Sequence, residues 1–351
     1  MTLLENSVQT LTVEDALNAA RLRIQVTPAE LTEARQRRDD LRACLAREFG
    51  GRTYVNGSIA HGDALNPLTD VDLGVIVPNP EHEYGPDRRG PRALQDRAAD
   101  AIRRDLKDKY PNLRVENNDD RHRSILVRFG DPVAPGEPDF TADVITAIDN
   151  PDGAGLFIPK HATWDRSHPE RHTDLVKTAN EKSKSTFARG TRLIKHWNRK
   201  HDKPICSWNI KALALDVINK PVSMTDYILT FLNHAIGELQ DRETPDPAGV
   251  AGPIKINDGW TRTQAVAELR DAKGIFDKAL EYQHDGYPIL ALDEFAKFFK
   301  NEEMMPKPNQ DDVHLAARAW WKERNPSLVT TAPAASTSPI GDRLPTRSWS
   351  C

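Results

Sequence analysis

Two aspartates, Asp70 and Asp72, stand at the head of the apolar segment VDLGVIV, residues 71–77. Because residues two apart in a strand point to the same face, both carboxylates should project together while Val71 and Leu73 enter a core. Two carboxylates this close repel each other, and a divalent cation relieves the repulsion. Hard oxygen ligands favour Mg²⁺, which keeps coordination positions for substrate phosphates. Taken alone, the pair also fits a solvated turn.

A Gly-Ser pair, Gly57 and Ser58, follows a short predicted strand and precedes the two aspartates by one loop. Glycine lets the backbone approach a triphosphate closely. Serine adds a hydroxyl and a backbone N–H that can face phosphate oxygens. On its own the pair fits an ordinary strand-to-helix turn, but beside the aspartates we interpret it as part of a nucleotide-binding site.

The elements that position these residues follow from the sequence pattern. Thr27, Pro28 and Glu30 predict a helix start with a capping box, and that helix should run to about Glu48, before Gly50. Strands are predicted at 53–55, 71–77, 124–129 and 140–148, with a helix at 93–109. From about residue 170 the pattern is helical, with helices expected within 172–201 and at 209–219, 224–240, 262–283, 291–300 and 310–324.

Composition limits the class of protein. The chain has 351 residues and 48 Lys+Arg against 52 Asp+Glu, a net charge of −4, which disfavours a protein that mainly coats nucleic acid. No apolar run approaches the ~20 residues that span a bilayer, and the N-terminus lacks a signal-peptide pattern. Three scattered cysteines have no metal-ligand spacing. We expect a cytoplasmic protein with reduced thiols, no membrane and no obligatory nucleic-acid partner.

Gly-Ser, an eleven-residue gap and Asp-apolar-Asp at the head of a strand resemble the signature of the nucleotidyltransferase superfamily related to DNA polymerase beta. The resemblance implies an α+β fold, with a polymerase beta-like core of mixed sheet and helices followed by a helical domain, as two lobes around a cleft. It also implies a third carboxylate on a later, adjacent strand. Asp143 is the first candidate for that carboxylate and Asp139, beside Pro138, is the second.

The helical half of the sequence resembles one particular family within this superfamily. The segment RLIKHWNRKHDKPICSWNIKAL, residues 192–213, is similar to the cGAS/DncV-like nucleotidyltransferases (CD-NTases) of bacterial CBASS anti-phage systems, whose spine helix would be 28–48. In that family a lysine of the helix and a serine of the next segment contact the donor triphosphate, which implies Lys195 and Ser207. The alternative interpretation of Lys195 is a solvated charge on its helix, and that of Ser207 is the N-cap of the next helix. This chain departs from the family with Ile-Lys at 210–211, where Leu-Glu is frequent.

Three regions are expected along the chain. A nucleotidyltransferase core with the spine helix should occupy 1–165, and a helical C-terminal domain 166–325. Residues 326–351, rich in Pro, Ser, Thr and Ala, should form a disordered tail because they bury too little apolar surface to offset ordering entropy.

The resemblance also implies the reaction. A ribose hydroxyl attacks the α-phosphorus of an NTP, pyrophosphate leaves, and a final turn closes a cyclic di- or trinucleotide second messenger. Two Mg²⁺ ions, or Mn²⁺ in their place, are the expected cofactors. The expected catalytic and metal-binding residues are Asp70, Asp72 and Asp143, and the expected nucleotide-binding residues are Gly57, Ser58, Lys195 and Ser207.

The expected partners are NTPs and a downstream effector that senses the nucleotide product. In some operons such enzymes are joined through their C-terminal residue to targets by an E1/E2-like ligase, and Cys351 is that residue here. The alternative is that the C-terminal segment is unstructured and has no role.

Two other functions fit the same residues. A linear template-independent polymerase of the CCA-adding, poly(A) or oligoadenylate type would share the three aspartates, and a long basic RNA-binding face would favour it. A catalytically inactive regulatory or antitoxin-like protein on this fold is the second alternative. The intact aspartates disfavour it, because a binding module gains nothing from clustered unpaired carboxylates.

Overall fold

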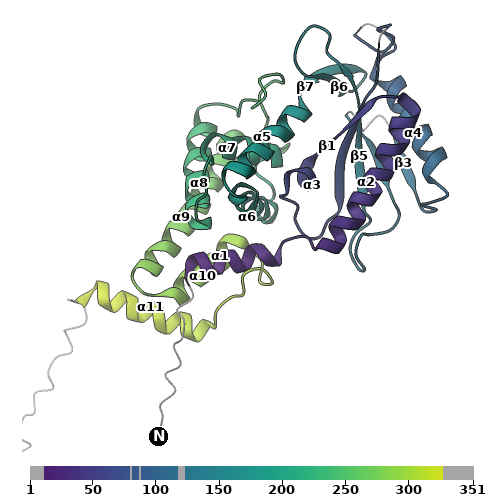
Figure 1. Ribbon diagram of the computed structural model, residues 1–351. Coiled ribbons are helices and arrows are strands. Elements are labelled where there is room, and N and C mark those ends of the chain that lie inside the picture. The colour runs from purple at the N-terminus through teal and green to yellow at the C-terminus, as the bar shows by residue number, and fades with distance from the viewer. Residues whose placement is uncertain (1–11, 80, 87, 118–122, 327–351) are drawn as a thin grey trace, which may run out of the picture.

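The computed structural model describes residues 12–79, 81–86, 88–117 and 123–326, so Cys351 and all but the first residue of the predicted tail lie outside it. The chain builds two large hydrophobic cores, one between a sheet and two helices and one among helices alone (Figure 1). Helix α5 (Pro169–Lys182) leads the chain from the sheet into the helical part.

The sheet is mixed. Its strands lie in the order β1-β2-β5-β4-β3. Strand β6 pairs with both β5 and β7. Only β2 and β5 pair in parallel among the described strands, the other pairs being antiparallel. The strands are β1 (Arg52–Asn56), β2 (Asp70–Ile76), β3 (Arg114–Glu116), β4 (Ile125–Arg128), β5 (Thr141–Asp149), β6 (Leu156–Lys160) and β7 (Thr163–Ser167).

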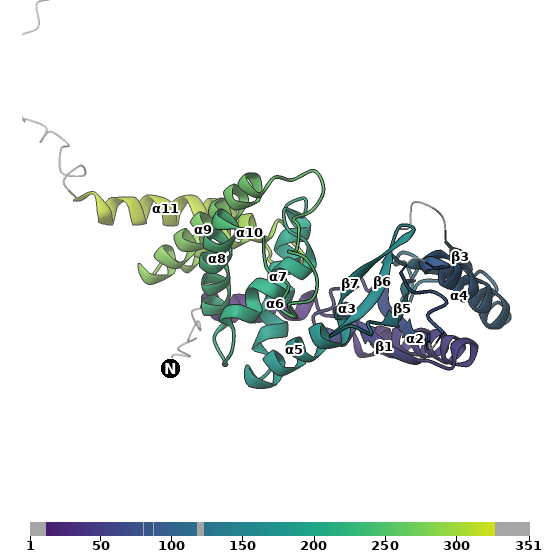
Figure 2. The same ribbon diagram turned by 90° about the horizontal axis from the view of Figure 1, so that it is seen from above.

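One face of the sheet is covered by helices α2 (Pro28–Phe49) and α4 (Gly90–Leu106) (Figure 2). Val71 and Leu73 of β2 are buried in the core beneath them. Because a strand alternates its side chains between faces, Asp70 and Asp72 project from the opposite face. That face also carries a small buried cluster made of Tyr54, Ile76, Ala147, Leu156 and Ile158.

The predicted limits of the long helix α2 are confirmed. Thr27 caps its start, and the Glu30 side chain returns a hydrogen bond to the Thr27 backbone. Gly50 ends it with a left-handed φ of 63°, a conformation that glycine adopts without strain.

The other expected helices of the C-terminal half are also present, with 172–201 divided into α5 and α6. They are α6 (Thr186–Lys200), α7 (Ser207–Val217), α8 (Met224–Asp241), α9 (Arg262–His284), α10 (Pro288–Phe299) and α11 (Gln310–Arg324). Large aromatic side chains such as Trp197, Phe231 and Phe298 fill the space between them. The helical part is thus a second core in its own right.

An unpredicted helix, α1 (Val13–Arg23), packs into this helical core and not against the sheet (Figure 1). Its buried residues are Val13, Ala16, Leu17 and Ala20. Glu14 accepts hydrogen bonds from the backbone N–H groups of Met224 and Thr225 at the start of α8, at 2.9 and 3.0 Å. The first helix is therefore held by residues some two hundred positions later.

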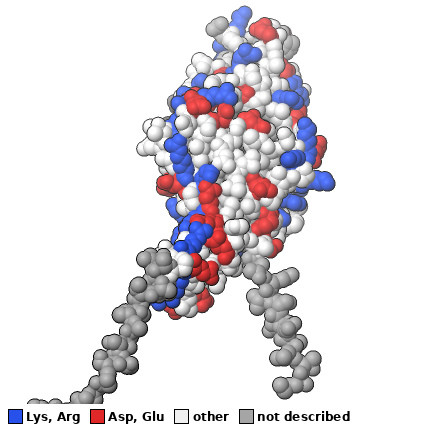
Figure 3. Space-filling model, turned by 90° about the vertical axis from the view of Figure 1, so that its left-hand side faces the viewer, with Lys and Arg blue, Asp and Glu red and all other residues white. Residues whose placement is uncertain are grey.

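No helix in the described ranges is long and apolar enough to cross a membrane. On the face of the helical part shown in Figure 3, Lys and Arg lie among Asp and Glu side chains. A face of mixed sign offers nucleic acid no continuous basic track.

Candidate active site

Two of the predicted carboxylates lie directly opposite each other. The parallel register of β2 and β5 pairs Asp72 with Asp143, and the antiparallel register of β1 and β2 pairs Asn56 with Asp72. Asp70 is two residues before Asp72, at the first position of β2, so it shares the same face. The structure thus brings the three aspartates to one end of two neighbouring strands.

These carboxylates act on one another electrostatically. Burial and the negative charges of Asp70 and Asp143 raise the pKa of Asp72 to about 7. The Ser124 hydroxyl donates to Asp143 Oδ1 at 2.8 Å and orients that side chain. As arranged, no group of three His, Cys, Asp or Glu side chains among the described residues is close enough to hold a metal ion. The donor chemistry fits a divalent cation, because a cation would relieve the repulsion that raises the pKa of Asp72.

Asp139, the second candidate for the third carboxylate, does not lie beside Asp72. It precedes β5, and its Oδ1 accepts a hydrogen bond from the Gly130 N–H at 2.8 Å. Asp139 therefore stabilises the turn between β4 and β5, which leaves Asp143 as the carboxylate that faces β2.

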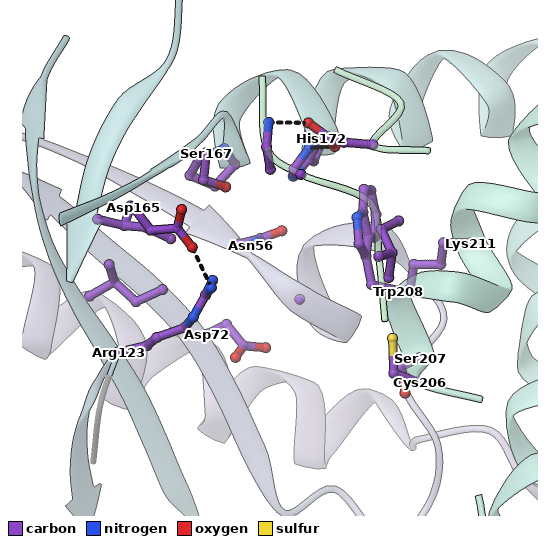
Figure 4. Close-up of a pocket in the computed structure, with 18 of the residues that line it drawn as sticks. Asn56, Asp72, Arg123, Asp165, Ser167, His172, Cys206, Ser207, Trp208 and Lys211 are labelled. Atoms are coloured by element: carbon purple, nitrogen blue, oxygen red, sulfur yellow. Dashed lines mark hydrogen bonds and ion pairs between the residues drawn. The ribbon is translucent and has the colours of Figure 1, made fainter. Parts of the chain in front are cut away.

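A cavity of about 770 Å³ lies beside the aspartates and is lined from both parts of the chain (Figure 4). From the sheet and α3 (Gly57–His61) come Tyr54, Asn56, Gly57, His61 and Asp72; from the helical part come His172, Cys206, Ser207, Trp208 and Lys211. Figure 4 shows Asp72 on one side and the α7 residues across from it. The volume and the aromatic and charged lining suit a nucleotide.

Trp208 is a functional candidate that the sequence did not reveal. Its ring lies 4.5 Å from the ring of His172, centroid to centroid. His172 Nε2 is 2.6 Å from Asp246 Oδ1, and the Asp246 carboxylate also accepts the backbone N–H of Ala251 at 2.9 Å. The indole is therefore backed by a fixed polar pair and presents an aromatic surface to the cavity. Its only sequence signal was its place directly after Ser207.

Lys195 and Ser207 come together at a second, smaller cavity of about 190 Å³, whose lining includes Arg199 and Lys203. Lys195 is 8% exposed, so the interpretation as a solvated helix charge is wrong. Its Nζ donates to the Asp63 carboxylate at 2.9 Å and to the Asp63 carbonyl at 3.0 Å. This lysine thus reaches the small cavity while paired with a buried acid.

Ser207 lines both cavities, but it is not the N-cap of α7. That position is taken by Cys206, whose Sγ accepts the Asn209 N–H at 3.3 Å. The N-cap interpretation of Ser207 is therefore wrong, and the Ser207 hydroxyl is not engaged in that cap. Gly57 lines the large cavity with a left-handed φ of 73°, and Ser58 follows it in α3.

Comparisons with known proteins concern the sequence and the fold. No protein-family model matches the sequence. The cyclic AMP-AMP-AMP synthase of Escherichia coli (strain MS 115-1) is 26% identical over 258 residues, spanning 66% of this chain and 74% of that protein. CdnC from E. coli MS115-1, solved with ATP, superposes with a TM-score of 0.61 at 17% identity, covering 82% of this chain and 98% of that chain.

Two further solved structures share the fold. The CD-NTase CdnG of Bradyrhizobium diazoefficiens, in complex with GTP, has a TM-score of 0.59 at 14% identity, over 88% of this chain and 98% of its own. DncV of Vibrio cholerae, bound to 3′-deoxy GTP, has a TM-score of 0.59 at 12% identity, over 83% of this chain and 93% of its own.

The chain has the fold of the solved CD-NTases, the polymerase beta-like nucleotidyltransferase fold, and its strands β2 and β5 bring two carboxylates into register. The expected α+β core followed by a helical part is confirmed. The sequence similarity to the cyclic AMP-AMP-AMP synthase and the fold shared with solved CD-NTases agree with the resemblance seen in the sequence.

Proposed function

We propose that this chain condenses NTPs into a cyclic di- or trinucleotide second messenger and releases pyrophosphate, as part of an anti-phage response. The observation that supports this most directly is the pairing of Asp72 with Asp143 beside a cavity lined from both parts of the chain. ATP is the first substrate to test, because the curated relative is a cyclic AMP-AMP-AMP synthase.

Asp70, Asp72 and Asp143 would hold divalent metal, two Mg²⁺ ions in our proposal. When bound, such ions supply charge stabilisation for the triphosphate and lower the pKa of the attacking hydroxyl. The chain's own residues position the reactants, which is most of what phosphoryl transfer requires. We assign Asp143, oriented by Ser124, to accept the proton of that hydroxyl.

Binding of the nucleotide would use both cavities. The Trp208 ring offers a stacking surface for a base in the larger one. Lys195 and Ser207 would contact the triphosphate near the smaller one, beside the backbone of Gly57 and Ser58.

The test is incubation of the full chain with Mg²⁺ and α-labelled NTPs, followed by phosphatase and separation of products. A phosphatase-resistant product that Asp70→Asn/Asp72→Asn does not make supports the proposal, and omission of single NTPs identifies the bases. A ladder of phosphatase-sensitive products would instead establish a linear polymerase. No product with any NTP, with or without co-expressed neighbouring genes, would favour the inactive regulatory protein.

Protein partners form a separate part of the proposal. The solved CdnC:HORMA complex of the E. coli relative makes a HORMA protein a reasonable activator to add to the assay. We also propose that an E1/E2-like ligase acts on Cys351. Mass spectrometry of the chain expressed with its neighbouring genes tests this, and the idea is wrong if Cys351 is never found attached to a partner.

A further inference from the structure

A buried carboxylate lies between the two cavities and faces two lysines. Asp63 is 0% exposed. Its Oδ1 accepts from Lys195 Nζ at 2.9 Å, and its Oδ2 is 3.1 Å from Lys211 Nζ. Lys195 comes from α6 and lines the small cavity, while Lys211 comes from α7 and lines the large one. One acid therefore contacts two ammonium groups, one from a residue that lines the small cavity and one from a residue that lines the large cavity.

The Lys211 ammonium is held at a defined position. It donates to His61 Nδ1 at 2.8 Å. Burial and the neighbouring Lys211 charge lower the pKa of His61 to about 3, so the ring is neutral and Nδ1 can accept. His61 Nε2 lies 3.2 Å from Thr173 Oγ1, which fixes the ring from its other side. The contact with Asp63 Oδ2 is an ion pair without hydrogen-bond geometry. An ammonium has three donors, so Lys211 has capacity for a ligand.

The charges in this cluster do not balance. Lys195 and Lys211 supply two positive charges, Asp63 supplies one negative charge, and His61 is neutral. A buried charge is costly unless it is paired. The nearest further attraction on Lys211 comes from Asp72, which is itself a proposed metal ligand. An anion in the large cavity, beside Lys211 and Ser207, would complete the pairing.

We propose that Lys211 is a second lysine that binds the triphosphate of the donor nucleotide, and that Asp63 and His61 are positioning residues for it. The inference rests on the proposed function and extends it to Lys211. Lys211 would bind phosphate from the large cavity while Lys195 binds from the small one. The two lysines, spaced by Asp63, would hold the triphosphate from two sides.

The experiment is equilibrium binding of two probes, α,β-methylene-ATP and adenosine, to the full chain in Mg²⁺ buffer by calorimetry. Lys211→Met should weaken binding of the ATP analogue about tenfold or more and leave adenosine binding within about twofold. It should still fold, because Asp63 keeps Lys195 as its partner. Lys220→Met, which removes an exposed lysine just after α7, is the matched control and should change neither affinity.

Asp63 is tested by its coupling to Lys211. Asp63→Asn should weaken analogue binding in the wild-type background by more than in the Lys211→Met background, because part of its effect passes through Lys211. Lys211→Arg should restore most of the affinity. If Lys211→Met does not fold, Lys211→Gln, which can still donate to His61, replaces it.

Equal losses for the analogue and adenosine, or no loss for either, would overturn the inference and leave Lys211 as a structural counterion of Asp63. A wild-type chain that binds neither probe would instead contradict the proposed function itself. The two failures are therefore distinguishable.

Discussion

Gly57 passes so close to Asp72 that a Cβ built at position 57 would lie 1.7 Å from Asp72 Oδ2. No real pair of atoms tolerates that distance, so any side chain at 57 must displace the carboxylate. The glycine that shapes the nucleotide site thus also fixes the position of a proposed metal ligand.

Gly57→Ala should therefore abolish product formation in a protein that still folds. Its φ of 73° alone costs about 1 kcal/mol or more with a Cβ. Gly62→Ala is the matched control, because Gly62 has the same φ of 73° but its Cβ would meet nothing closer than 3.9 Å. Gly57→Ala should lower the melting temperature at least as much as Gly62→Ala, and only Gly57→Ala should lose product formation. Equal activities would show that Asp72 can move without consequence.

Asp72→Asn should stabilise the metal-free protein while it removes activity. Burial and the charges of Asp70 and Asp143 disfavour the ionised form of Asp72, and the amide removes that repulsion. In EDTA the melting temperature should rise by about 2 °C or more above wild type. An unchanged or lower value would mean that the three carboxylates do not repel one another in the folded chain.

Asp143→Asn and Asp139→Asn separate the two candidates for the third carboxylate. Asp143 pairs in register with Asp72, so its loss should lower the rate of product formation on the order of a thousandfold. Asp139 accepts the Gly130 N–H, which an asparagine Oδ1 can also accept, so its variant should keep most activity and change the melting temperature little. Rates measured at saturating NTP decide between them, and the opposite pattern would move the proposed metal site to Asp139.

Trp208→Ala should raise the KM for NTP about tenfold or more, because stacking on an aromatic ring is worth about 1–3 kcal/mol per base. Trp208→Phe keeps a stacking surface and should recover most of the loss. Trp321, 47% exposed on α11 and far from the cavity lining, provides the control through Trp321→Ala. A KM unchanged in Trp208→Ala would show that the base lies elsewhere.

The contribution of His61 to stability should fall as the solution becomes acidic. His61 has a folded pKa of about 3, below the ordinary value of 6.5, so between these values the unfolded chain binds a proton that the folded chain does not. The free energy of unfolding should then drop by about 1.4 kcal/mol per pH unit from this residue alone as pH falls below 6.5. His172 and His196, whose pKa values burial also lowers, act in the same direction, whereas Asp72, whose pKa is raised, acts in the opposite direction.

Denaturant titrations at pH 7.0 and at lower pH values, in steps of about one unit, measure how the free energy of unfolding changes with pH. His61→Gln, which can still accept from Lys211, should reduce the slope by the contribution of one residue. The same slope in wild type and variant would mean that His61 does not stay neutral in the folded chain.

Local patterns were sufficient to predict much of the fold and the faces of the catalytic strands. The alternation of Asp70 and Asp72 with Val71 and Leu73 is a property of one strand, and it determined which side chains face the helices. The Thr27 capping box is equally local. Short elements such as β3, β6 and β7 gave no pattern of their own, because pairing with neighbouring strands defines them.

The buried polar network was not predictable for a different reason. Asp63, Lys195 and Lys211 are adjacent only because the segment after α3 meets α6 and α7, and each residue alone resembles an ordinary surface charge. Trp208 likewise acquires its place through His172 and Asp246, which are distant in sequence.

The position of α1 has a consequence for biosynthesis. The Val13 N–H hydrogen-bonds to the Gln283 side chain, a separation of 270 residues, and α1 buries its apolar face among helices that are translated well after it. The sheet's core can form as soon as its own strands have left the ribosome, but α1 must wait until helices as late as α9 are made. Until it docks, the apolar face of α1 is exposed to solvent and can be bound by chaperones. Contacts this distant in sequence are also slow to form, so docking of α1 should be a late step in maturation.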